Sequence, residues 1–170
     1  MIKINLNKTI SILSILIVLS ISAAYAGSIL SADKVLVIKS ERKMILLNNG
    51  VVIKTYPIML GQNPVGHKQE RGDDRTPEGE YVLKGRNPQS RFHRSIHISY
   101  PNKADEEAAR KKGVDPGRYI AIHGLPEKSE EAEWDYIERD WTDGCIAVTN
   151  EQIEEIWELV KDGTPIVIKP

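Results

Sequence analysis

Short apolar runs separated by polar residues follow one another along residues 34–60, and this pattern predicts β-strands. Asn48 to Gly50 lie between two runs rich in β-branched residues, and an Asn-Gly turn in such a place is the strongest short-range signal for a hairpin. Shorter runs of the same kind predict further strands over residues 80–85, 94–100, 119–124 and 164–170. Most of the chain is therefore expected to form sheet.

Helical periodicity occurs in two segments. Residues 102–113 have the composition of a short exposed helix. The second segment lies near the C-terminus, where Thr149 and Gln152 fit a capping box and Gly163 and Pro165 predict the end of the helix. Apolar residues recur there at i, i+3, i+4 and i+7, namely Ile153, Ile156, Trp157 and Val160. We expect a mostly β domain of the α+β class with one core-packing helix.

Two long polar segments separate these elements. Residues 61–80 are rich in Gly, Pro and charged residues and predict a loop, and loops of this length in compact domains are often part of a site. Residues 127–140 are acidic and include Trp134 and Tyr136. They predict either a solvated loop with its aromatic residues tucked beneath it, or a lid whose acids attract a cationic amine.

The first 26 residues have the pattern of a signal peptide. Lys3 and Lys8 precede an apolar run at residues 10–21, and "AYA" at 24–26 fits a cleavage site. The alternative is an uncleaved membrane anchor, but the run is shorter than the roughly 18 to 20 apolar residues of a spanning helix. We expect residues 1–26 to be a signal peptide and to provide the only contact with a membrane before they are removed.

The remaining residues 27–170 are long enough for one domain with its own core, and no linker or repeat divides them. Loss of the two signal-peptide lysines changes the net charge from −1 to about −3. This charge, without a dense basic cluster, argues against nucleic acid as a partner. The expectation is a single exported domain.

Cys145 is the only cysteine. Cysteines of exported proteins usually form disulfides, so a single one is free, bonded to another chain, chemically active, or simply buried and inert. Gly144 precedes it and the apolar run 146–148 follows, so the thiol is expected at the mouth of a site. Gly144 would let a substrate carbonyl approach, and nearby backbone N–H groups could form an oxyanion hole.

A cysteine nucleophile needs a base, because the thiolate is the reactive form and the ordinary thiol pKa is about 8.5. His123 ends an apolar strand, and the charged segment between it and Cys145 is long enough to bring the two together. We therefore predict a Cys145/His123 pair, with the carbonyl of Gly124 as a candidate to orient the imidazole.

The other histidines are weaker candidates. His93 and His97 lie four residues apart in a predicted strand, where four residues span about 13 Å, too far for two ligands of one ion. We expect no metal site and no organic cofactor. His67, in the long loop, is a candidate substrate contact, with a solvated loop histidine as the alternative.

Four stretches of the chain resemble the L,D-transpeptidase catalytic domain family, which remodels bacterial peptidoglycan. They are "VLVIKSERKMILLNNGVVIKTYPIMLG", "RTPEGEYVL", "IHG" and "TDGC". The resemblance implies a mostly β, sandwich-like catalytic domain, with Cys145 as nucleophile and His123 as base. It further implies that the Gly124 carbonyl orients the histidine and that the N–H groups of Gly144 and Cys145 form the oxyanion hole.

The resemblance also implies a reaction. Cys145 would form a thioester with the third residue of a tetrapeptide stem, usually diaminopimelate, and release D-alanine. An amine of another stem, or of a lysine on an outer-membrane lipoprotein, would then accept the acyl group. Such an enzyme is expected in the periplasm or elsewhere in the exported cell envelope, and to act in cell-wall organisation and cell shape.

One position departs from the family motif Ser/Thr-His-Gly-Cys, since Asp143 stands where the histidine usually does. A carboxylate beside the thiol opposes thiolate formation and alters the acceptor side, so Asp143 and Thr142 are candidate substrate contacts. Amide-cleaving members also occur in similar branches. The alternatives are thus a hydrolase on the same scaffold, either an L,D-carboxypeptidase or an amidase that releases protein, and a non-catalytic wall-binding module.

Overall fold

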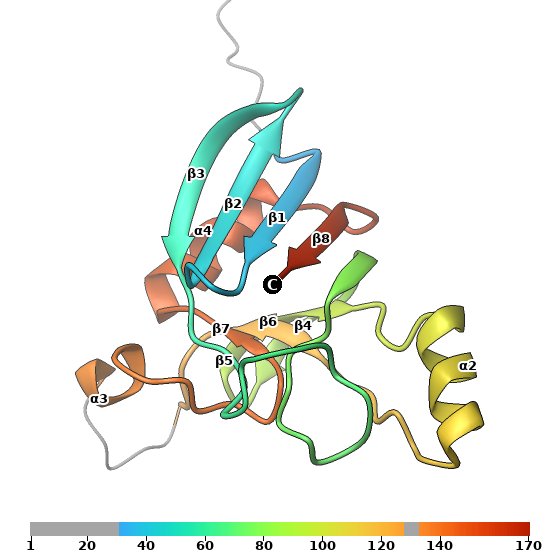
Figure 1. Ribbon diagram of the computed structural model, residues 1–170. Helices are drawn as coiled ribbons and strands as arrows, with labels where there is room; N and C mark the ends of the chain where they lie inside the picture. Colours follow the sequence, from blue (N-terminus) through green and yellow to red (C-terminus); the bar gives the residue numbers. More distant parts are fainter. Residues whose placement is uncertain (1–30, 128–132) are drawn as a thin grey trace, which may run out of the picture. The chain divides into compact units, whose positions relative to one another are not determined.

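The computed structural model describes residues 31–127 and 133–170, and within this part the strands form one sheet (Figure 1). Its order is β3-β2-β1-β8-β4-β5-β6-β7. The bounds are β1 Lys34–Ile38, β2 Lys43–Asn48, β3 Val51–Pro57, β4 Gly79–Ser90, β5 His93–Ile98, β6 Ala121–His123, β7 Ile146–Ala147 and β8 Pro165–Lys169. The mostly β prediction is confirmed.

The predicted hairpin is formed by β2 and β3. Asn49 and Gly50 join these antiparallel strands with φ angles of 50° and 78°, as expected of a two-residue turn with both central residues at positive φ. β1 pairs antiparallel with β2 on the opposite side from β3. β8 then pairs in parallel with β1 and antiparallel with β4, and so joins this hairpin unit to the strands that carry the site.

The sheet curls because β4 changes partner along its length. Its first residues pair with β8, and from Leu83 onward it pairs with β5, with a register shift next to Gly85, whose φ is 68°. The chain after β3 then runs beside β7, where the backbones of Met59 and Ala147 exchange hydrogen bonds of 2.9 and 2.8 Å. Strands from opposite edges of the sheet are thereby brought together beside the candidate site.

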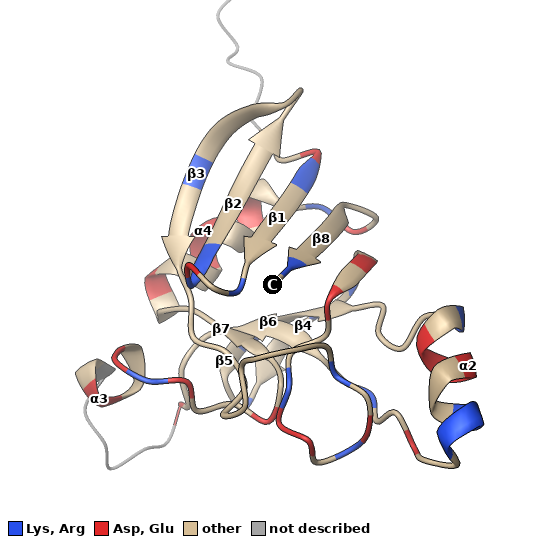
Figure 2. Ribbon diagram, viewed as in Figure 1, with Lys and Arg blue, Asp and Glu red and all other residues tan. Residues whose placement is uncertain are grey.

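The helices are α2 (Lys103–Lys112), α3 (Glu133–Ile137) and α4 (Asn150–Leu159). The capping box of Thr149 and Gln152 is present at the start of α4, and Ile153 and Ile156 are fully buried in the core. Full burial of an apolar side chain of this size contributes about 1.5 to 3 kcal/mol. Figure 2 shows that α2 is acidic in its first turn and basic in its last, which suits the helix dipole.

The predicted end of α4 at Gly163 is wrong. The helix stops at Leu159, because the Leu159 carbonyl accepts a hydrogen bond of 2.8 Å from Ala32 N–H. Val160 is already extended, with φ −107° and ψ 127°, and forms a parallel bridge with Ala32. Val160 is nonetheless buried in the core, so the apolar pattern correctly predicted its burial although not its helical conformation.

Within the described residues, no helix is both long and apolar enough to cross a membrane. The expected signal peptide, residues 1–26, lies outside the described residues.

Candidate active site

The segment from Thr142 to Cys145 forms a turn that is braced by one hydroxyl. Thr142 Oγ1 donates to the Cys145 carbonyl at 2.8 Å and accepts from Gly144 N–H at 3.1 Å. Thr142 is buried, so its side chain fixes the backbone that carries the thiol. The Gly144 N–H, one of the two expected oxyanion donors, is engaged by this hydroxyl.

Only glycine fits at position 144. Its φ is 119°, and a Cβ there would lie 2.5 Å from the carbonyl oxygen of Arg75. Gly61 is just as confined, since its Cβ would lie 2.0 Å from the Asp74 carbonyl oxygen and 3.0 Å from Gly144 Cα. The long loop after β3 therefore packs backbone against backbone on the turn of residues 142–145, which we call the nucleophile turn after the predicted role of Cys145. Participation of this loop in a site stays a prediction.

His123 lies on the strand next to the one that follows Cys145. β6 and β7 are parallel and pair His123 with Ala147, two residues after Cys145. The thiol lies against the segment that leads into β6, because its Sγ is 3.7 Å from the Tyr119 carbonyl oxygen. Cys145 is free and half-buried, whereas His123 is 3% exposed.

The orientation of the His123 ring is set by its neighbours. Its Nδ1 is 2.7 Å from the Gly124 carbonyl oxygen, and because a carbonyl can only accept, we assign the proton to Nδ1 and leave Nε2 with a free lone pair. Phe92 stacks on the ring at 4.4 Å between centroids and 22° between planes, and Trp141 meets it edge-on at 5.6 Å.

Burial lowers the pKa of His123 from 6.5 to about 4. The hydrogen bond to the Gly124 carbonyl acts in the opposite direction, and the charge of Arg91 adds to the lowering. The imidazole is therefore neutral at pH 7 and able to accept a proton.

The pKa of the Cys145 thiol is raised, first by burial. The backbone of Ala121 lowers it by hydrogen bonding, Asp143 raises it through its negative charge, and the cations Lys68 and Arg91 lower it. With the thiol pKa raised and the imidazole pKa lowered, both groups are neutral at pH 7. A nucleophilic role for such a thiol would require transfer of its proton to a general base.

The remaining predicted site residues are divided between two places. Asp143 is exposed on the nucleophile turn and lines a pocket of about 360 Å³ together with Lys68 and Tyr119. His67 instead lies beside α2, where its Nδ1 accepts from Glu78 N–H at 3.0 Å and its Nε2 is 3.2 Å from an oxygen of Asp105. Substrate contact by His67 stays a prediction.

The two histidines of β5 are also apart. His93 Nε2 is 2.6 Å from Glu154 on α4, and His97 meets the ring of Tyr119 edge-on. Within residues 31–127 and 133–170, no three His, Cys, Asp or Glu side chains are grouped as a metal site would require.

Sequence reasoning missed the aromatic support of the histidine. Phe92 follows β4 and gave no signal, because its stacking on His123 depends on how β4 and β5 curl. Trp141 directly follows the acidic segment, and it packs with Tyr136, Met59 and Leu125 in a small cluster. Trp134, on the same segment, is exposed. Residues 128–132 lie outside the described part of the chain, so a lid over the thiol stays a prediction.

Comparison with known proteins gives three relevant similarities. YafK from Escherichia coli (strain K12), whose name describes it as an L,D-transpeptidase, is 32% identical to this chain over 111 residues. These residues make up 64% of this chain and 37% of YafK. The helical cell shape determining protein Pgp2 from Campylobacter jejuni superposes with a TM-score of 0.60 and 24% identity over 81% of this chain and 48% of Pgp2. An Enterococcus faecium L,D-transpeptidase superposes with a TM-score of 0.53 and 14% identity, over 82% of this chain and 50% of its own.

The chain thus spans about half or less of each of these relatives, and the two structural matches are evidence for the fold alone. The family match is broader. Residues 32–168, nearly all of the described chain, match the L,D-transpeptidase catalytic domain. This range includes the curled sheet, the nucleophile turn and the strand of the oriented histidine, and the chain belongs to the L,D-transpeptidase catalytic domain family.

Proposed function

We propose that this domain is a Cys/His acyltransferase that acts on peptidoglycan stem peptides. Membership of the family supports an enzyme of the cysteine acyltransferase type. In the proposed reaction Cys145 attacks the carbonyl of the third stem residue, diaminopimelate, and forms a thioester, with release of D-alanine. The observation that carries the proposal is the hydrogen bond from His123 Nδ1 to the Gly124 carbonyl, because it leaves Nε2 free to act as base.

The proton balance follows from the neutral pair. As Sγ attacks, the Cys145 proton passes to His123 Nε2, which makes the imidazolium. Collapse of the tetrahedral intermediate breaks the amide C–N bond, and the imidazolium gives its proton to the nitrogen of the departing D-alanine. An amine next attacks the thioester carbonyl, His123 takes a proton from it, and the departing sulfur is reprotonated to the thiol.

The oxyanion that forms during attack requires N–H donors. The N–H of Cys145 is the proposed first donor. The Gly144 N–H could serve as a second only if it exchanged its bond to Thr142 Oγ1 for one to substrate.

The acceptor is proposed to be an amine, attracted by Asp143. This carboxylate is exposed and adjoins the nucleophile in the chain, so it favours an incoming ammonium group. The amine would belong to a second stem or to a lysine of an outer-membrane lipoprotein, in a compartment of the cell envelope reached through the predicted signal peptide. Pgp2 is a cell-shape determinant, and remodelling of stems would give this protein a related role.

The test is a product assay on purified muropeptides that carry tetrapeptide stems. Wild type should produce diaminopimelate–diaminopimelate dimers, identified by mass spectrometry, and C145S and H123Q should produce none. H97Q, which removes a histidine of β5, is the matched control and should leave the dimers. Tripeptides without dimers, lost in C145S, would replace the transferase with a hydrolase in which water takes the place of the amine. Absence of any Cys145-dependent product, or of a covalent carbapenem adduct on Cys145, would contradict catalysis altogether.

A further inference from the structure

The pocket beside the nucleophile turn has charges of both signs in its lining, three cations and two carboxylates. It is formed by Lys68, Arg71, Gly72, Asp74, Gly117, Arg118, Tyr119, Ile120 and Asp143. Two of these residues place it next to the thiol. Asp143 is two residues from Cys145, and the Tyr119 carbonyl oxygen is 3.7 Å from Sγ. A group held in this pocket therefore lies next to the thiol. The acidic part of the lining includes Asp143, proposed above to attract the acceptor amine, and the cations are left for an anionic group of the donor.

The three cations of the pocket differ in how they are engaged. Lys68 is 3% exposed, and its ammonium donates to Asp73 at 2.8 Å. Arg71 pairs with Asp115, at 2.9 Å from Nε and 2.7 Å from the terminal nitrogen. Within the described part of the chain, Arg118 makes no ion pair as close as those of Lys68 and Arg71, although its charge helps to lower the pKa of Asp115, and its side chain is exposed. It is thus available to an anion from outside.

The backbone that carries Arg118 is fixed to the long loop. Arg71 N–H donates to the Asp115 carbonyl at 2.7 Å, and Asp115 Oδ1 accepts from Gly117 N–H at 2.8 Å. Gly117, with a φ of 79°, lies so close that an added Cβ would be 3.4 Å from Arg71 Cα. Arg118 is therefore presented from an ordered segment, which lowers the entropic cost of binding.

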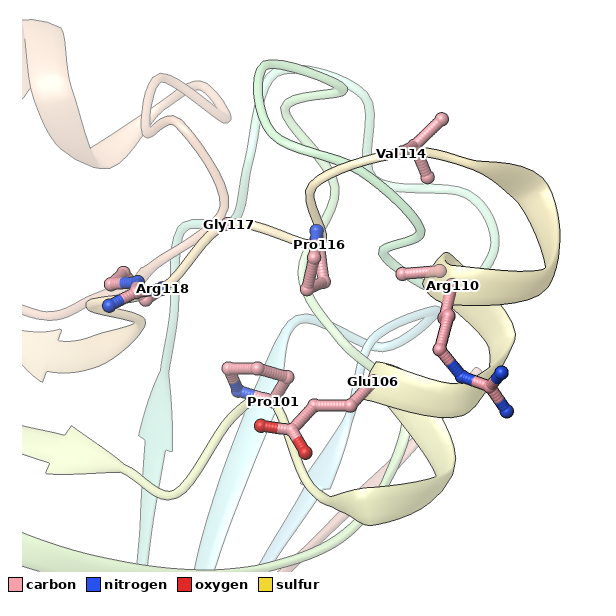
Figure 3. A pocket seen from close by; sticks show the side chains of 8 residues that line it. Pro101, Glu106, Arg110, Val114, Pro116, Gly117 and Arg118 are labelled. Atoms are coloured by element: carbon pink, nitrogen blue, oxygen red, sulfur yellow. The ribbon is translucent and has the colours of Figure 1, made fainter.

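A neighbouring pocket shares Gly117 and Arg118 and extends toward α2 (Figure 3). In this view Pro101 and Pro116 lie between Arg118 and the charged residues of α2, Glu106 and Arg110. The lining of this neighbouring pocket includes charges of both signs, whereas the pocket of the nucleophile turn is the one that lies next to the thiol.

We propose that Arg118 binds a free carboxylate of the donor stem while the scissile carbonyl lies at Cys145. The proposal rests on the function above and adds a specificity-determining residue to it. Guanidinium groups bind carboxylates with two parallel hydrogen bonds, which supply orientation as well as affinity. A stem of this kind has two carboxylates near the reacting carbonyl, one at the end of the diaminopimelate side chain and one on the terminal D-alanine, and both share this chemistry.

Binding to a C145S background tests the proposal without turnover. The probe is a soluble tetrapeptide stem, and its Kd is measured by calorimetry for C145S and C145S/R118Q. We expect C145S/R118Q to bind the stem about tenfold more weakly than C145S. C145S/R118K should recover part of the lost affinity, because lysine keeps the positive charge but lacks the two parallel N–H donors of arginine. C145S/R110Q, which removes an arginine of α2 on the far side of the neighbouring pocket, is the matched control and should bind as C145S does.

Two modified stems identify the carboxylate. One has the diaminopimelate side-chain carboxylate replaced by a carboxamide, and the other ends in D-alaninamide. Whichever carboxylate meets Arg118, its amide should bind about tenfold more weakly to C145S, with no further loss in C145S/R118Q. The proposal is overturned if R118Q does not weaken binding of the natural stem, or if it weakens binding of both amide stems further. It is also overturned if C145S binds no stem. Normal Arg118-dependent binding with no turnover by wild type would instead keep this inference and contradict the proposed reaction.

Discussion

At the scale of single residues, two influences act on the His123 ring. Its bond to the Gly124 carbonyl fixes the tautomer, while burial against Phe92 and Trp141 keeps the ring neutral. Burial also makes protonation of the ring costly to the fold, and this cost can be measured.

Substitution of His123 by glutamine should flatten the loss of stability in mild acid. The pKa is about 4 in the folded protein and 6.5 ordinarily, so between these values the unfolded chain binds the proton and the folded chain does not. Stability therefore falls as the pH drops through this window, by up to about 3 kcal/mol. Urea unfolding at pH 7 and pH 4.5 measures the difference.

H97Q is the control for that comparison, because it removes a less buried imidazole. It should keep the wild-type dependence on pH. An equal pH dependence in H123Q and wild type would show that the folded protein does not hold this ring neutral.

At the scale of elements, the nucleophile turn and the long loop after β3 form one backbone-packed unit. Gly144 and Gly61 allow the contact, and Thr142 braces the turn from within. The position of Cys145 thus depends on residues some 70 positions earlier in the chain, such as Arg75.

Alanine at position 144 should be far more damaging than alanine at position 163. Both glycines have positive φ, 119° and 94°, but an added Cβ meets the Arg75 carbonyl at 2.5 Å in the first case and nothing within 4 Å in the second. G163A should therefore cost only the backbone strain, about 1 to 2 kcal/mol. G144A should cost roughly 2 kcal/mol more and abolish turnover, as measured by urea unfolding and the muropeptide assay. Equal unfolding free energies for the two variants would exclude the close contact.

Features set by local sequence were predictable and those set by distant contacts were not. The Asn-Gly hairpin, the capping box at Thr149 and the strand ending at His123 each depend on a few adjacent residues. The early end of α4 depends on Ala32, more than a hundred residues away. The positive φ of Tyr119, 69°, which accompanies the approach of its carbonyl to the thiol, has no sequence signal either, because a tyrosine rarely adopts it.

At the scale of the whole described domain, Asp140 connects the first strands to the nucleophile segment. Its Oδ1 accepts from Leu60 N–H at 2.8 Å, and its Oδ2 from the terminal nitrogen of Arg42 at 2.7 Å. The backbone then continues the contact, since Trp141 and Thr142 both donate to the Leu60 carbonyl at 3.1 Å. One carboxylate thus ties the turn before β2, the chain after β3 and the start of the nucleophile turn.

Removal of this carboxylate in D140A should destabilise the domain by about 1 to 3 kcal/mol, mainly because the Leu60 N–H loses its acceptor, since the Arg42 side chain is 40% exposed and its pair is screened by solvent. The control is E41A, which breaks an ion pair with Lys43 in which both side chains are half exposed. That pair should contribute less than about 1 kcal/mol. Thermal and urea unfolding of both variants gives the comparison, and losses of equal size would mean that the Asp140 connection adds nothing beyond a surface pair.

The place of β8 in the sheet has a consequence for the order of assembly. It is the last strand along the chain, yet it lies between β1 and β4 and supplies the ladder through which the N-terminal hairpin meets the histidine strands. Neither half can close around the core until those five residues arrive, so contacts far apart in sequence must form late and slowly. A protein threaded across a membrane from its N-terminus would remain open, and its thiol unassembled, until residues 165–169 have followed.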